Sequence, residues 1–90
     1  MTKDAKFYFG NLISDVVRSA NAALKNDDAR YEDSLLRAYT TLEYLRFARR
    51  PEAYEEGLLL LRALAHARAR GKLSALRAHL STFAESFAII

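Results

Sequence analysis

Three arginines surround a phenylalanine in the stretch LRFARRP, residues 45–51. Guanidinium groups bind phosphate oxygens through two parallel hydrogen bonds, and aromatic rings stack on nucleobases. Arg46, Arg49 and Arg50, together with Phe47, could therefore contact a polyanion. The same arginines could instead stabilise the negative end of a helix, with the neighbouring aromatic side chains in the core. Both interpretations fit the sequence.

A second basic row consists of Arg62, His66 and Arg70, spaced four residues apart, and Arg77 nearly continues it. On a helix this spacing places the side chains on one face. Acidic partners are scarce, because Glu85 is the one acidic residue after position 56. The row is either a solvated helix face or a set of phosphate contacts, and the lack of compensating charge favours the second interpretation.

The positive charge is concentrated in the second part of the chain. Residues 1–36 carry five Lys and Arg against six Asp and Glu, whereas residues 37–90 carry nine against five, a balance of +4 in a chain of net charge +3. An asymmetry of this kind is typical of proteins with an anionic partner. RNA or single-stranded DNA would be such a partner, but charge of this density is also common on ordinary soluble helices.

Catalytic and cofactor chemistry has little support in the sequence. A superfamily of small helical ribonucleases uses an arginine and a histidine four to six residues further along, but three residues separate Arg62 from His66, and no carboxylate nearby would orient the imidazole. The chain has no cysteine, phosphate-binding loop, dinucleotide fingerprint or zinc-ligand spacing. We expect no enzyme activity, no cofactor and no metal site.

The elements that position these residues are predicted to be helices, since three glycines and one proline interrupt a chain rich in Ala, Leu and Arg. We expect an all-α bundle of about four helices forming a single domain over residues 1–90. The first helix should span about 4–25, and the second should begin near Asp28 and stop close to Arg50. Pro51 should open the third. The inner faces of the first two helices should carry Phe9, Leu12, Ile13, Val16, Val17, Ala20, Ala23 and Leu24, and then Tyr31, Leu35, Ala38, Leu42 and Leu45.

The last part of the chain leaves two questions open. Gly71 predicts a helix end, although residues 52–89 could also form one kinked helix. The final helix carries apolar residues alternately three and four positions apart, and the chain ends in FAII. This terminus should pack either inside the bundle or against a neighbouring subunit. The predicted interaction surface comprises Phe83, Phe87, Ile89 and Ile90.

No membrane segment is expected. The longest purely apolar run, Leu58 to Leu61, is far shorter than the roughly 20 residues that a membrane span requires. The N-terminal sequence MTKDAKFYFG also lacks the apolar core of a signal peptide. These features predict a cytoplasmic protein.

The stretch YLRFARR ends an apolar helix, a long leucine-rich helix follows it, the chain ends in FAESFAII, and NLISDVV at residues 11–17 fits a first core helix. On these features, residues 11–90 resemble the small helical subunit of type III CRISPR effector complexes. The resemblance implies a non-catalytic subunit that lies along a guide RNA and its target, with Arg49 or Arg50 matching an arginine that closes the second helix. This chain is short and lacks an N-terminal extension, which leaves the related small subunit of archaeal type I complexes as an alternative.

The sequence thus leads to two hypotheses of different class. The first is a non-catalytic helical subunit that binds RNA or single-stranded DNA inside a ribonucleoprotein complex with other protein subunits. Its phosphate contacts would come from Arg46, Arg49, Arg50, Arg62, Arg70 and Arg77. The second is a protein-interaction or oligomerisation bundle that does not bind nucleic acid and associates through its C-terminal apolar residues.

Overall fold

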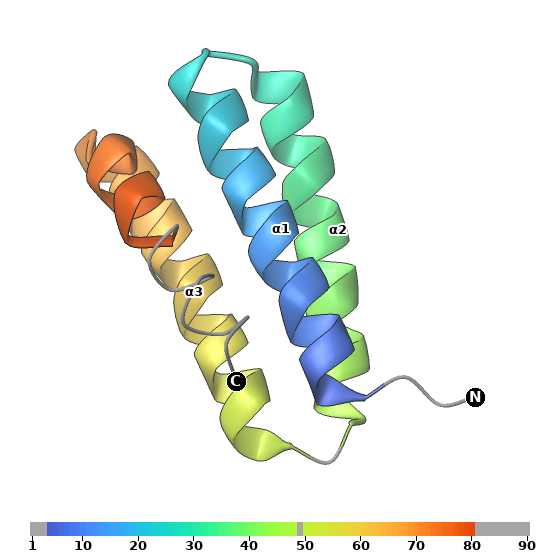
Figure 1. Cartoon of the computed structure of the whole chain (residues 1–90). Coiled ribbons are helices and arrows are strands. Elements are labelled where there is room, and N and C mark those ends of the chain that lie inside the picture. The colour runs from blue at the N-terminus through green and yellow to red at the C-terminus, as the bar shows by residue number, and fades with distance from the viewer. Residues whose placement is uncertain (1–3, 49, 81–90) are drawn as a thin grey trace.

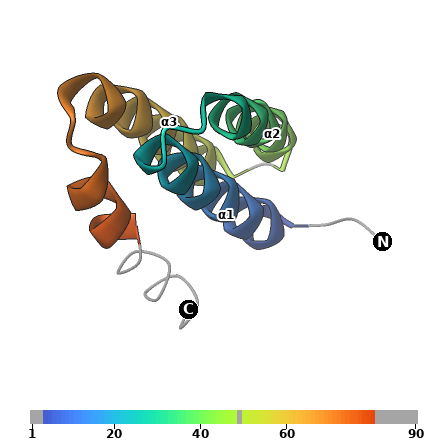
Figure 2. The same cartoon turned by 90° about the horizontal axis from the view of Figure 1, so that it is seen from above.

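The computed structural model describes residues 4–48 and 50–80. Three long helices, α1 (Ala5–Leu24), α2 (Asp28–Arg46) and α3 (Pro51–Arg70), each run antiparallel to the helix before (Figure 1). Residues 73–80 are also helical and lie beside α1, away from α2 (Figure 2). The described residues contain no strand, so the predicted all-α bundle of about four helices is confirmed.

The link between α1 and α2 is short because side chains and backbone satisfy both helix ends. Asn26 adopts a positive φ of 58°, which asparagine tolerates better than most residues. The backbone N–H of Asp27 then donates to the carbonyl of Ala22 at 2.8 Å, and the Asp27 carboxylate accepts from the N–H of Arg30 at 3.1 Å. The predicted boundaries of both helices at this link are confirmed to within one residue.

The junction between α2 and α3 differs from the prediction. Helix α2 ends at Arg46, not close to Arg50, so it stops before the residue whose helical geometry Pro51 disfavours. Arg50 is extended, with φ −125° and ψ 80°, and its carbonyl accepts the N–H groups of Ala53 and Tyr54. Arg50 therefore lies outside α2 and is the N-cap residue of α3. Pro51 opens α3 as predicted.

Gly71 separates α3 from the last described helix. Its φ of 67° lies in the left-handed region, and the N–H of Lys72 closes the turn onto the carbonyl of Ala67 at 2.8 Å. The two-helix alternative is therefore the observed one. Leu73 and Leu80 are buried in the core of the bundle, so the described part of the apolar spacing faces inward. The predicted interaction residues Phe83, Phe87, Ile89 and Ile90 lie outside the described residues.

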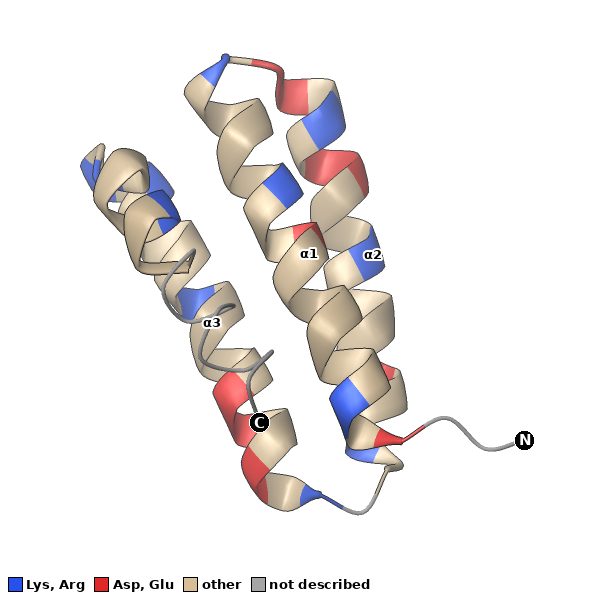
Figure 3. Ribbon diagram, in the orientation of Figure 1, with Lys and Arg blue, Asp and Glu red and all other residues tan. Residues whose placement is uncertain are grey.

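Charged residues occur along all three long helices (Figure 3), and most of them are exposed. Across the described residues, no helix combines the length and the apolar character that crossing a bilayer requires.

The core forms where α3 meets the α1 and α2 pair. Helix α1 packs more extensively against α2 than against α3. At Gly57 of α3, a methyl group in place of the Cα hydrogen would stand 2.5 Å from Leu12 and 3.0 Å from Leu42. The glycine therefore permits close approach of α3 to both other helices. The largest fully buried side chains are Leu12, Leu45, Leu61, Leu64, Leu80, Val16 and Ser19.

We expect Gly57→Ala to gain much less stability than Gly10→Ala. Both glycines are in helix interiors, where alanine is favoured by about 0.5–1 kcal/mol. Position 10 has open space for a methyl group, whereas position 57 would be overpacked, which costs about 1–3 kcal/mol. Urea unfolding of the two variants should place Gly57→Ala below Gly10→Ala by that amount. Equal gains at both positions would show that α3 does not pack this closely.

Candidate nucleic-acid interface

Aromatic rings from two helices meet at the end of the bundle where α1 begins and α2 ends. Tyr8 stacks on Tyr44, with ring centroids 5.4 Å apart and planes at 17°. Phe7 meets Tyr8 edge-on at 5.5 Å. Phe7 is 43% exposed and Tyr44 55% exposed, so these rings offer open faces and edges to solvent. An aromatic ring of a ligand that stacks on these exposed rings would be stabilised by the contact.

Phe47 extends this surface from the end of α2. It lies one helical turn beyond Tyr44, is 75% exposed, and has the Arg46 guanidinium 5.9 Å from its ring centroid. The alternative in which the aromatic residues of this stretch are buried in the core is therefore wrong for Phe47 and Tyr44. We refer to Phe7, Tyr8, Tyr44 and Phe47 as the aromatic cluster.

Sequence reasoning missed the contribution of α1 to this cluster. The run KFYFG places three aromatic residues in succession, and successive helical residues point about 100° apart. Such a run cannot be buried on one face: Phe9 is buried, whereas Phe7 is exposed. That pattern was the available signal for exposed rings, but nothing in it indicated Tyr44 as the partner of Tyr8.

The arginines of the junction lie together but carry acidic partners. Arg46 is 3.8 Å from Glu43, and Arg50 donates to Glu52 at 2.7 Å. That hydrogen bond from Arg50 lowers the pKa of the Glu52 carboxyl. Arg46 and Arg50 both line a hollow of about 410 Å³ beside Tyr54. Exposed pairs of this kind contribute only about 0–1 kcal/mol, so a phosphate can displace the carboxylate. Arg49 lies outside the described residues.

The basic row on α3 contrasts with these paired arginines. Arg62, His66 and Arg70 are exposed, and none of them has a hydrogen bond or ion pair with another described residue. Arg62 and Arg70 are about 12 Å apart along the helix axis. Figure 3 shows acidic residues on the first turns of α3 and basic residues toward its end. The structure therefore leaves the basic row open to an anionic partner.

Arg77 and Arg68 are engaged within the fold. Arg77 Nε donates to Asn21 Oδ1 at 3.0 Å, which joins residues 73–80 to α1. The Arg68 guanidinium lies 3.9 Å from the ring centroid of the buried Tyr31 and pairs with Asp28 at 3.1 Å. Of the five described arginines that were predicted as phosphate contacts, Arg77 is thus the one whose side chain bonds to another helix.

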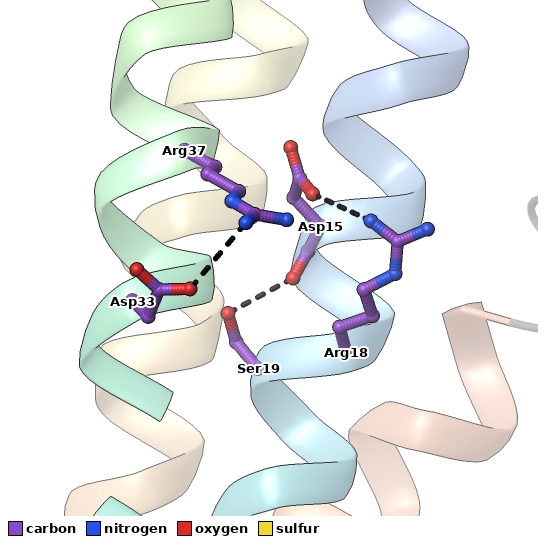
Figure 4. Close-up of polar contacts among 5 residues, drawn as sticks. All are labelled: Asp15, Arg18, Ser19, Asp33 and Arg37. Atoms are coloured by element: carbon purple, nitrogen blue, oxygen red, sulfur yellow. Dashed lines mark hydrogen bonds and ion pairs between the residues drawn. The ribbon is translucent and has the colours of Figure 1, made fainter. Parts of the chain in front are cut away.

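A polar groove runs between α1 and α2, with a volume of about 580 Å³. Asp15, on α1, is buried, with its side chain only 9% exposed, and its Oδ1 accepts from Arg18 Nη1 at 3.2 Å (Figure 4). Across the groove Arg37 pairs with Asp33 at 3.7 Å. We define the polar groove by six of its lining residues, Asn11, Asp15, Arg18, Arg37, Thr40 and Thr41.

Burial raises the pKa of the Asp15 carboxyl above its ordinary value of 3.8, while the guanidiniums of Arg18 and Arg37 oppose this shift. A raised native pKa means that the native state binds the proton more tightly than the unfolded state. The stability that this group contributes is present below pH 3.8 and is lost as the pH rises through the raised pKa.

We therefore expect Asp15→Asn to gain stability relative to the parent protein as the pH rises from about 3 to 7. An asparagine cannot ionise, and its amide oxygen can still accept from Arg18. Thermal unfolding of both proteins across this pH range measures the difference between their melting temperatures. The other carboxyl groups titrate in both proteins, so their effect on this difference largely cancels. A difference that stays constant, or that shrinks with rising pH, would contradict the raised pKa.

Other chemistry is not assembled by the described residues. They contain no group of three His, Asp or Glu side chains that could hold a metal ion. His66 has no hydrogen-bond partner among them, and His79 is exposed. Comparison of the chain with protein-family models, curated proteins and solved structures found no match.

Proposed function

We propose that this protein is a non-catalytic helical subunit that binds single-stranded RNA or DNA within a ribonucleoprotein complex. The observation that carries the proposal is the aromatic cluster, which exposes rings from two helices beside Arg46. Soluble domains bury most large aromatic side chains, and a group of exposed rings next to a guanidinium is the arrangement on which single strands stack.

The arginines supply the electrostatic part of this proposal. Arg46 and Arg50 lie at the same end of the bundle as the rings, and the basic row on α3 presents two guanidiniums without acidic partners among the described residues. A strand whose bases stack on the cluster would have its phosphates drawn toward these cations. Because stacking on the aromatic cluster involves no contact with base edges, the cluster can bind a strand of any sequence.

The surroundings of the histidines support a non-catalytic role. A general base needs a second group that fixes its orientation and tautomer. The His66 imidazole has no hydrogen bond or ion pair with any described side chain. The resemblance to CRISPR small subunits, carried by YLRFARR and FAESFAII, supports a place inside a larger assembly in which cleavage belongs to other subunits.

A protein-interaction bundle without nucleic-acid binding is the second candidate. The observation that favours it is the exposure of apolar residues on the outer faces of α2 and α3, where Leu36 is 68% and Leu59 56% exposed. Titration with labelled single-stranded RNA, single-stranded DNA and duplex DNA at two salt concentrations, with light scattering in parallel, separates the two candidates. Self-association without binding to any strand would favour the second.

We expect Tyr44→Leu to weaken single-strand binding by about 1–3 kcal/mol, because leucine keeps the apolar contact but cannot stack on a base. Tyr39→Leu is the matched control, since Tyr39 is similarly exposed on the same helix but outside the cluster. Fluorescence anisotropy with a labelled oligonucleotide measures both. Equal effects of the two substitutions would remove the aromatic cluster from the binding site.

We expect the double variant Arg62→Gln/Arg70→Gln to lower the salt dependence of binding. Each phosphate contact to a single strand contributes about 0.7 to the slope of log affinity against log salt concentration, so the slope should fall by about 1.4. The control variant Lys25→Gln/Arg30→Gln removes the same charge from the end of α1 and the first turn of α2. A slope that changes as much in this control would assign the effect to net charge alone.

A further inference from the structure

The polar groove contains a buried carboxylate with one oxygen still open. Asp15 Oδ1 accepts from Arg18, while Oδ2 has no hydrogen-bond partner among the described residues. In that part of the chain, no fully buried side-chain oxygen or nitrogen is left without a partner. Solvent therefore reaches Oδ2. Because Asp15 lines the polar groove, this oxygen is open to the groove. A ligand in the groove would meet a hydrogen-bond acceptor at its base.

The mouth of the groove carries two guanidiniums and the exposed carboxylate of Asp33, which pairs with Arg37 at 3.7 Å. The side chains of Arg18 and Arg37 are 62% and 65% exposed, so their guanidiniums lie toward solvent on the two sides of Asp15 (Figure 4). An anionic group is repelled from the Asp15 carboxylate and attracted to these guanidiniums. A nucleotide has two parts that match this arrangement. Its base is neutral and carries hydrogen-bond donors, and its phosphate carries the negative charge.

The groove also leads to the aromatic cluster. Tyr8 precedes Asp15 by seven residues on α1, and Tyr44 follows Arg37 by seven on α2. Seven residues are nearly two helical turns, so each tyrosine lies on the same stripe of its helix, about 10 Å along the axis from the charged residue. The stacked tyrosines are thus the next layer of the same α1 and α2 interface, and a strand that stacks on them can continue into the groove.

We propose that the polar groove is a base-selective subsite in which Asp15 Oδ2 accepts a hydrogen bond from the exocyclic amino group of adenine, cytosine or guanine. This inference rests on the proposed single-strand binding and adds a preference to it. Thymine and uracil lack that amino group, and the carbonyl in its place would face the carboxylate. A carboxylate oxygen and a base carbonyl are both hydrogen-bond acceptors. When they face each other, neither has a donor, and the base with an amino group is preferred.

The test compares oligo(dC) with oligo(dT) of equal length by fluorescence anisotropy, for the parent protein and for Asp15→Asn. The parent should bind oligo(dC) about fivefold to tenfold more tightly. Asp15→Asn should abolish or reverse this ratio, because its amide can donate to the thymine carbonyl. Glu32→Gln, which removes one negative charge of an exposed pair with Arg68 outside the groove, should keep the ratio.

Single-strand binding without a preference in the parent, or with the same preference in Asp15→Asn, would overturn the subsite and leave the proposed function intact. Failure to bind any strand would overturn both. A second measurement needs no variant: the carboxyl ¹³C resonance of Asp15 in the parent protein should shift with added cytidine monophosphate more than with uridine monophosphate. Equal shifts would also overturn the subsite.

Discussion

The close approach of α3 to the α1 and α2 pair at Gly57 is the contact on which the arrangement of the bundle depends. Leu12 of α1 and Leu42 of α2 converge on the space that a side chain at position 57 would fill. Because α3 comes this near, its first turn lies against the end of α2, and Arg46 and Arg50 line one hollow although α2 ends between them. A wider separation would divide the junction arginines between two surfaces.

The arginines of this small protein fall into groups that sequence composition does not separate. Arg68 and Arg77 join elements, one by covering Tyr31 and pairing with α2, the other by binding Asn21 of α1. Arg46 and Arg50 form ion pairs with glutamates close to them in sequence, and these exposed pairs contribute little to stability. Arg62 and Arg70 have no partner among the described residues. A count of basic residues therefore overstates the surface available to phosphates, and the basic end of α3 carries most of what is left.

Asp15 places a buried carboxyl group at the interface between α1 and α2. A carboxylate beneath two exposed arginines loses hydration, and burial outweighs the opposing effect of the guanidiniums on its pKa. An apolar residue or an amide at this position would avoid that cost. The same residue opens an acceptor onto a groove whose lining residues Asn11 and Thr41 lie about one helical turn from the stacked Tyr8 and Tyr44. The proposed base-selective subsite gives this buried charge a role.

The sequence by itself determined the local features. Alanine and leucine content, the capping residues at 26–28, Pro51 and Gly71 located the helices, and the three-four spacing located the buried faces, because each of these signals acts within one or two turns. The tertiary structure alone decided which exposed groups meet. That Tyr8 stacks on Tyr44, that Arg77 reaches Asn21, and that Asp15 lies across from Arg37 all follow from how antiparallel helices cross and pack. Helical periodicity specifies which face of a helix turns inward, but not which residue of another helix stands opposite. The end of α2 at Arg46 was only partly predictable. Pro51 indicated in the sequence that a new helix begins there, but the length of the turn before it was not visible.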